Sequence, residues 1–218
     1  PVGGKVLWIL SFLAFIGDPT QTIQEGFRFL EDKPAAVGLE GYLFPDTYRM
    51  ERGVDVESVV SFFLKNFDAR FTNEFRQEAM RRARTMFEIV TMASLIEKEV
   101  VSGEDRMLVS GILWKRLKLG IPLQVDATIV FIKKQQGAEP RPNGRISSED
   151  TKIDSPYNTY RYAGLPHGPI GNPGLLSLKA AVYPKESPYL YYLSRRDGTT
   201  IFSRTLEEHN IAKAKYLR

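Results

Sequence analysis

The chain has 218 residues, which suits one domain or one domain plus a fragment. Hydrophobic residues make up 43% and charged residues 26% of it, which excludes a disordered chain and a membrane-embedded bundle. The absence of cysteine excludes a disulfide framework, a cysteine nucleophile and a thiolate metal site. The net charge of +4 leans mildly towards anionic partners, but the basic residues form no nucleic-acid motif, so no nucleic-acid partner is expected.

The N-terminal segment, 1–36, contains the most hydrophobic run of the chain, Val6 to Ile16. This run is too short to cross a bilayer, so it predicts a buried helix or strand. It also lacks the basic start and the cleavage site of a signal peptide. A short polar helix containing Phe27, Phe29 and Leu30 is expected next, and Lys33-Pro34 indicates a boundary after it.

Four successive helices are predicted for the middle of the chain, because apolar residues recur there at helical spacing behind capping residues. Thr85 and Glu88 form a capping-box pair, and Gly120 marks a clear stop. The predicted ranges are Asp55 to Phe71, Thr72 to Arg84, Thr85 to Val101, and Glu104 to Leu119.

The later part of the chain mixes extended segments, loops and shorter helices. Residues 121–128 are predicted to run extended into a helix that Asp126 would cap, and Asn172-Pro173 would begin a helix at 175–182. Residues 189–202 give a strong hairpin signal around a turn at 196–198, and Thr205 with Glu208 makes a capping box for a last helix. Strands that gather late favour an α+β fold, a helical core with a small antiparallel or mixed sheet.

Glu97 is an unusual carboxylate in the third predicted helix. At about 100° per residue, the apolar side chains share one arc, and Glu97 projects from the middle of it. Burial there would raise the pKa of Glu97, so that it could stay protonated near neutral pH and donate a proton to a leaving group. The alternative is a structural ion pair with an arginine. The candidate partners are Arg81, Arg84 and Arg106.

Two stretches rich in aromatic residues, Leu39 to Tyr48 and Ser155 to Gly174, could bind sugar rings or belong to the core. The glycines of the second stretch suggest a phosphate cradle, but its prolines remove the N–H donors that such a loop needs. No serine-hydrolase elbow is present, and neither His167 nor His209 has zinc-site spacing. A buried glutamate beside aromatic and amide groups therefore favours glycan cleavage, with no metal or cofactor.

Several ordered motifs resemble the YceG-like family of endolytic murein transglycosylases. They are LEGYLFPDTY at Leu39 to Tyr48, ASLIEKE at Ala93 to Glu99, LQVDAT at Leu123 to Thr128, and SPYNTY with GLPHGPIGNPG at Ser155 to Gly174. Two positions depart from the pattern, since Ala127 and His167 stand where the family often has proline. The resemblance implies a catalytic domain over 37–218, a remnant of a LysM-like subdomain over 1–36, and Glu97 of the EKE motif as the catalytic acid. The substrate-binding residues that we expect are Glu40, Tyr42, Gln124, Asp126, Thr128, Tyr157, Asn158, Thr159, Tyr160 and Asn172.

The resemblance also implies a substrate, a reaction and a location. Peptidoglycan glycan strands would be cut between N-acetylmuramic acid and N-acetylglucosamine, and the muramic acid's own 6-hydroxyl would capture the cation as a 1,6-anhydro end. The enzyme would be single-pass in the bacterial inner membrane, through an N-terminal anchor that this chain lacks, with its catalytic domain outside and cell-wall synthases as possible partners. The alternatives are a hydrolytic muramidase that uses Asp126 or Glu40 as a second carboxylate, and a non-catalytic glycan-binding or wall-synthesis scaffold.

Overall fold

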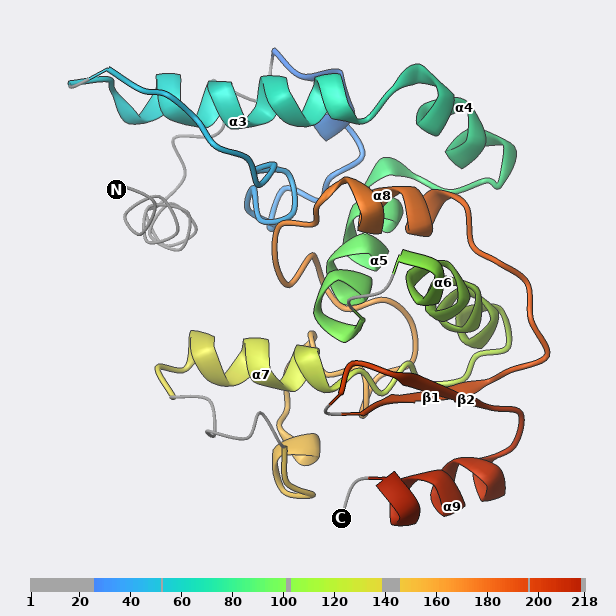
Figure 1. The fold of residues 1–218 in the computed structure, drawn as a ribbon. Coiled ribbons are helices and arrows are strands. Elements are labelled where there is room, and N and C mark those ends of the chain that lie inside the picture. Colours follow the sequence, from blue (N-terminus) through green and yellow to red (C-terminus); the bar gives the residue numbers. More distant parts are fainter. Residues whose placement is uncertain (1–25, 52, 101–102, 139–145, 196, 217–218) are drawn as a thin grey trace.

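The computed structural model describes residues 26–51, 53–100, 103–138, 146–195 and 197–216. Helix α5 (Met86–Glu99) runs through the middle of the molecule, and the other elements surround it (Figure 1). Residues 89–96 of α5 are all buried, because neighbours cover the helix on more than one side. Helices α6 (Gly103–Lys118) and α8 (Leu175–Val182) pack against α5 and against each other.

Helices α3 (Val56–Arg70) and α4 (Asn73–Arg81) lie beyond one end of α5, together with the 3-10 turn η1 (Arg28–Leu30) (Figure 1). The expected caps are confirmed: the side chains of Asp55 and Thr72 each accept a bond from a backbone N–H of the first turn, and Thr85 with Glu88 forms a complete capping box. Packed aromatic rings join this part to the core. They belong to Phe29, Tyr42, Phe67, Phe71 and Phe75.

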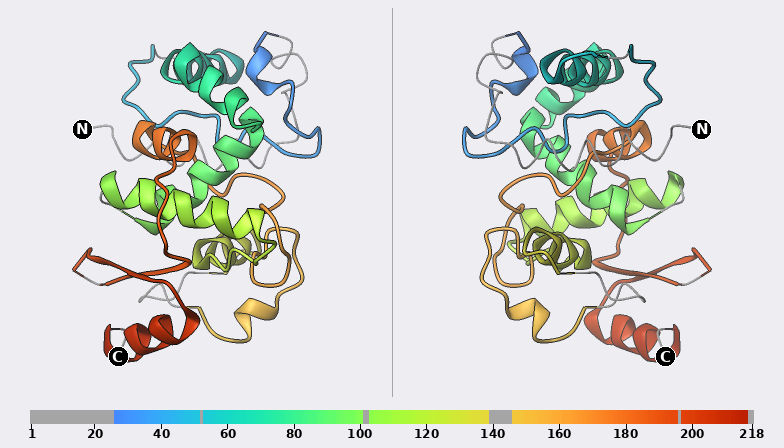
Figure 2. Two further views of the ribbon diagram at one scale, coloured as in Figure 1. Left: turned by 90° about the vertical axis from the view of Figure 1, so that its right-hand side faces the viewer. Right: turned by 90° about the vertical axis from the view of Figure 1, so that its left-hand side faces the viewer.

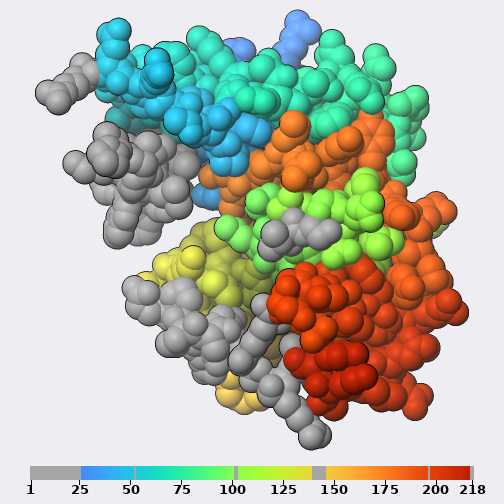
Figure 3. All heavy atoms as spheres, in the orientation of Figure 1, coloured from blue at the N-terminus to red at the C-terminus, as the bar shows by residue number. Residues whose placement is uncertain are grey.

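Towards the other end of α5 lie α7 (Asp126–Gln135), the 3-10 turn η2 (Asp150–Lys152) and the C-terminal elements (Figures 1 and 2). Strands β1 (Tyr191–Ser194) and β2 (Thr200–Ser203) form the predicted antiparallel hairpin, in which Tyr191 pairs with Ser203. Helix α9 (Leu206–Tyr216) packs on this hairpin. On the face seen in Figure 3, these red C-terminal elements lie below the green α5–α6 region. The α+β class is thus confirmed.

Some predicted boundaries and caps are wrong in detail. Helix α4 ends at Arg81 instead of near Arg84, because Ala83 adopts a left-handed backbone with φ 52°. The residue before α7 is Val125, not Asp126, and the residue before α8 is Gly174, not Asn172; neither gives a side-chain cap. In the last capping box, the Glu208 carboxylate accepts from the N–H of Arg204 and not from that of Thr205.

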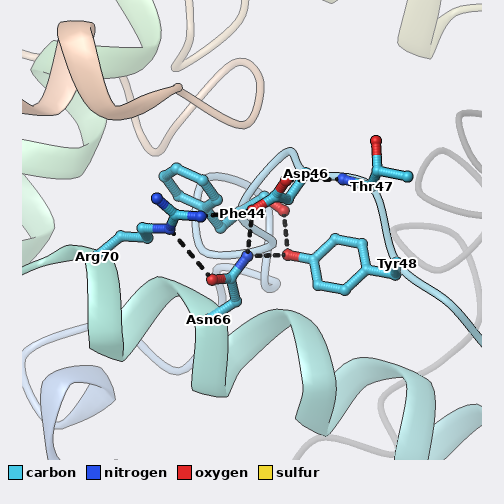
Figure 4. A network of polar contacts seen from close by, with 6 residues as sticks. All are labelled: Phe44, Asp46, Thr47, Tyr48, Asn66 and Arg70. Carbon is cyan, nitrogen blue, oxygen red and sulfur yellow. Dashed lines mark hydrogen bonds and ion pairs between the residues drawn. The ribbon is translucent and has the colours of Figure 1, made fainter.

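The predicted stretch Leu39 to Tyr48 is fastened to α3 by a polar network (Figure 4). The Asp46 carboxylate lies 2.9 Å from the guanidinium of Arg70, and the amide of Asn66 donates to Asp46 at 3.1 Å and to the Tyr48 hydroxyl at 2.8 Å. Tyr48 in turn donates to the carbonyl of Phe44 at 2.7 Å. Of the two alternatives left open for the aromatics here, the structure supports core, since Tyr42 and Phe44 are buried.

The hydrophobic run Val6 to Ile16 lies outside the described residues. After it, Phe29 and Leu30 pack into the same core as α3 and α5. The proposed division at residue 36 remains a prediction. In the described part of the chain, none of the helices combines the length and the apolar character that crossing a bilayer requires.

Candidate active site

The last turn of α5 carries two carboxylates, Glu97 and Glu99. Residues two positions apart in an α-helix point in directions that differ by about 200° around the axis. The two side chains therefore leave the helix on different sides. Glu97 points towards α6 and the start of α8, whereas Glu99 points towards β1 and the start of α7. The EKE motif therefore places two acids in two distinct surroundings.

Glu97 binds the N-terminal end of α8. Its Oε2 accepts a hydrogen bond from the Ser177 hydroxyl at 2.6 Å and one from the N–H of Gly174 at 3.2 Å. Its Oε1 lies 3.9 Å from the guanidinium of Arg106, one of the three arginines that the ion-pair alternative named. The side chain is 30% exposed, so the expectation of a carboxylate enclosed by apolar groups is wrong for Glu97. These contacts tie the Glu97 side chain to α8 and α6.

Glu99 lies against polar groups of β1 and the start of α7. Its Oε2 accepts a hydrogen bond from the Tyr192 hydroxyl at 3.0 Å, and the Ser194 hydroxyl donates to its backbone carbonyl at 3.0 Å. Burial raises the pKa of Glu99 to about 7, the charge of Asp126 adds to this rise, and hydrogen bonds from Tyr192 and from the Ala127 N–H oppose it. Glu99 is therefore an acid that carries a proton up to neutral pH.

Sequence periodicity missed Glu99 because its side chain lies outside the apolar arc of its own helix. The groups that bury it come from β1 and α7, and helical spacing contains no information about either. The one usable signal was the paired acids of the EKE motif.

Asp126 and Tyr160, two predicted binding residues, lie beside Glu99. The Tyr160 hydroxyl donates a hydrogen bond to Asp126 Oδ1, and Asp126 is exposed at the first position of α7. Gln124 is exposed next to it, with its side-chain oxygen held at 3.0 Å by Arg116 and a left-handed backbone at φ 53°. We call the following residues the Glu99 cluster: Glu99, Gln124, Asp126, Tyr160 and Tyr192.

Four predicted binding residues are buried and are corrected to structural roles, since a fully enclosed side chain cannot contact a glycan. Thr159 accepts a bond from the N–H of Val125 at 3.0 Å and bonds Thr128 at 3.1 Å, which fastens the LQVDAT segment to the SPYNTY segment. The Asn158 amide donates to two carbonyls of residues 151–153. The four residues, each at most 1% exposed, are Tyr42, Thr128, Asn158 and Thr159.

The remaining predicted residues, Glu40, Tyr157 and Asn172, form a second group. The Asn172 side chain accepts from the N–H of Gly41 at 2.8 Å and donates to Glu40 at 3.2 Å. Burial raises the pKa of Glu40, and the charge of Lys98 opposes the rise. Tyr157 packs against Phe131 and His167. Glu40 is thus a partly buried carboxyl held by an amide.

The described residues contain no group of three or more histidine, cysteine or acidic side chains that could hold a metal ion. The site offers a carboxyl group with a raised pKa, a second carboxylate and two tyrosine hydroxyls. These groups belong to Glu99, Asp126, Tyr160 and Tyr192. Such a set can transfer one proton to and from a substrate.

The model of the YceG-like family matches residues 16–215. This chain belongs to the YceG-like family. Two curated relatives of this YceG-like chain are named endolytic murein transglycosylase. The one from Bacillus subtilis is 37% identical over 82% of the chain, and the one from Streptococcus pneumoniae (strain D39) is 30% identical over 95%.

The YceG-like fold also has a solved counterpart, a putative YceG-like protein from Listeria monocytogenes. It superposes with a TM-score of 0.80 at 33% identity, over 94% of this chain and 66% of that one. The chain spans 48% of the B. subtilis relative and 39% of the S. pneumoniae relative.

Proposed function

We propose that this YceG-like chain is the catalytic part of an endolytic peptidoglycan lytic transglycosylase, with Glu99 as general acid and then general base. The bond cleaved is the β-1,4 linkage from N-acetylmuramic acid to N-acetylglucosamine. The observation that carries the proposal is the position of Glu99, whose carboxyl accepts from Tyr192 beside the exposed Asp126 that Tyr160 bonds; burial there raises the pKa of Glu99 to about 7. The names of the curated relatives supply the substrate class.

The reaction that fits this cluster needs one proton and no water. Protonated Glu99 donates its proton to the glycosidic oxygen as the bond to the muramic acid C1 breaks, which leaves an oxocarbenium-like centre. Ionised Glu99 keeps the hydrogen bond from Tyr192. It then takes the proton of the 6-hydroxyl as O6 bonds to C1. Glu99 ends protonated, as it began, and the product is a 1,6-anhydro end.

Asp126 supports this cycle as a neighbouring charge. A like charge nearby disfavours ionisation, so Asp126 helps Glu99 to hold its proton until the substrate takes it. An internal nucleophile makes a second catalytic carboxylate dispensable, unlike in paired-carboxylate hydrolases. The Tyr160 hydroxyl occupies one oxygen of Asp126 and orients it.

The family resemblance implies Glu97 of the EKE motif as the acid, and we assign that role to Glu99 of the same motif instead. The carboxylate of Glu97 is already engaged, since it is bonded by Ser177 and Gly174 and lies near Arg106. Glu99 alone of the two combines burial with a neighbouring negative charge.

A matched pair of variants tests the assignment. Glu99→Gln and Glu97→Gln each replace one carboxylate by an amide of the same shape. Uncrosslinked glycan strands are digested and the products weighed by mass spectrometry. We expect anhydro ends from the wild type, none from Glu99→Gln, and anhydro ends from Glu97→Gln. Undiminished cleavage by purified, folded Glu99→Gln protein would reject Glu99 as the acid.

The same digest separates the alternatives. A muramidase would release ends heavier by one water than the anhydro form, and a scaffold would bind strands without shortening them. Action on the cell wall places the proposed activity on the outer side of the membrane. The N-terminal membrane anchor, the LysM-like subdomain and the synthase partners remain expectations from the family resemblance.

A further inference from the structure

We infer that Glu97 is a positioning residue, which joins the last turn of α5 to the start of α8 and so sets the direction in which Glu99 leaves the helix. This inference rests on the proposed function, because it takes Glu99 as the acid. Of the two glutamates in the EKE motif, Glu99 would then transfer the proton and Glu97 would hold Glu99 in position.

Glu97 gives α8 the cap that its own sequence lacks. Gly174, at the N-cap, has no side chain to accept a bond from the first turn. The Glu97 carboxylate binds this end from outside the helix: it accepts from the N–H of Gly174 itself and from the hydroxyl of Ser177 in the first turn, which is fully buried. A negative charge at the N-terminal end of a helix is stabilising. α8 itself is anchored, since Leu178 and residues 180–182 are buried in the core.

The turn that Glu97 holds needs an anchor. α5 ends at Glu99, and Val100 is already extended, with φ −141° and ψ 146°, so Glu99 has no further turn of helix behind it. Contacts from other elements hold this end instead. Arg106 combines two of them, because its guanidinium lies 3.9 Å from Glu97 and donates to the carbonyl of Val100 at 3.1 Å.

Two further contacts on this turn come from β1, on the opposite side of the helix. The Ser194 hydroxyl bonds the carbonyl of Glu99, and Tyr192 bonds its carboxylate. The turn is therefore held between α8 with α6 on one side and β1 on the other. If the Glu97 side chain is released, the link from this turn to α8 is lost and only the Arg106 bond to Val100 remains on that side, so the Glu99 carboxyl can shift relative to the glycosidic oxygen. A displacement of about 1 Å at a reacting group can reduce a rate by about a hundredfold.

Two substitutions at Glu97 separate positioning from catalysis. Glu97→Gln keeps an oxygen that accepts from Ser177 and Gly174, so we expect it to retain most of the turnover rate. Glu97→Ala removes both bonds, and we expect kcat to fall by about tenfold to a hundredfold with KM little changed. The pH at which the remaining activity declines should stay that of the wild type, because Glu99 still titrates. Glu186→Gln, an exposed glutamate between α8 and β1, serves as the matched surface control.

Each outcome decides between the roles. If Glu97→Gln is as inactive as Glu99→Gln, Glu97 takes part in proton transfer and the inference is wrong. If Glu97→Ala loses thermal stability but keeps the wild-type kcat per folded molecule, Glu97 only supports the fold, and the inference is equally wrong. Failure of the proposed function itself has a different signature, namely that Glu99→Gln remains active whatever the Glu97 variants do.

Discussion

The hydroxyl of Tyr192 donates a hydrogen bond to Oε2 of Glu99 at 3.0 Å, and this contact joins the C-terminal hairpin to the end of the central helix. A donor of this kind stabilises the carboxylate over the carboxylic acid. The C-terminal part of the chain thus completes the surroundings of an acid that lies 93 residues earlier. Four predictions follow from the relations among Glu99, its neighbours and the helices that carry them.

Tyr192→Phe removes the hydroxyl and keeps the ring. Loss of a donor to the charged form raises the pKa of Glu99 further above about 7. Since the protonated form is the one that donates, the decline of kcat/KM at alkaline pH should move to higher pH. A pH profile of strand cleavage measures this. A profile that moves to lower pH would contradict the assigned direction of the bond.

Asp126→Asn should move the same profile the other way. The substitution removes the negative charge that disfavours ionisation of Glu99, while the amide oxygen can still accept from Tyr160. The pKa of Glu99 falls, and activity is lost at a lower pH than in the wild type. Opposite displacements by Tyr192→Phe and Asp126→Asn, recorded in one buffer series, would identify Glu99 as the titrating group; displacements of the same sign would exclude it.

Glu99 should also impose a pH dependence on stability. Its pKa is about 7 in the folded protein against an ordinary value of 4.5, so the folded state holds the proton more tightly than the unfolded chain. The stabilisation is fully present below about pH 4.5 and is lost as the pH rises to about 7. The difference between these two pKa values corresponds to about 3 kcal/mol in the free energy of unfolding.

Urea unfolding between pH 4.5 and 7 tests this linkage. In the wild type, the part of the free energy of unfolding that belongs to Glu99 falls with rising pH. Glu99→Gln, which cannot titrate, should lack this part, so the difference between variant and wild type must change across the range. A constant difference would mean that Glu99 is not buried enough to hold its proton.

Gly111→Ala should destabilise the protein although alanine is the better helix former. Alanine in the interior of α6 would gain about 1 kcal/mol from helix propensity. A Cβ at Gly111 would, however, lie 2.0 Å from the carbonyl oxygen of Lys185, a backbone atom that cannot move aside alone. We expect a net loss of about 1–3 kcal/mol, the usual cost of overpacking. Gly103→Ala, in the same helix with no atom within 4 Å, is the control for the urea measurement.

The starts of α3, α4 and α5 were predictable because their signals are local. Asp55, Thr72 and Thr85 each bond a backbone N–H only three residues ahead, and the turn and alternation of the hairpin are equally short-range. Caps failed where another element supplies the group: Asn172 was predicted to cap α8 but bonds Gly41, more than a hundred residues away in sequence. Local patterns carry no information about such contacts.

The sequence by itself determined the α+β class and the order of the helices, since these depend on composition, periodicity and residue order. The family resemblance predicted Glu97 of the EKE motif as the acid, and that assignment stays a prediction. Only the tertiary structure decided which EKE glutamate loses its water and which predicted binding residues are enclosed. Burial and neighbouring charge arise from segments that meet in space: the charge of Asp126 raises the pKa of Glu99, while Ser177 and Arg106 hold the Glu97 side chain against α8 and α6.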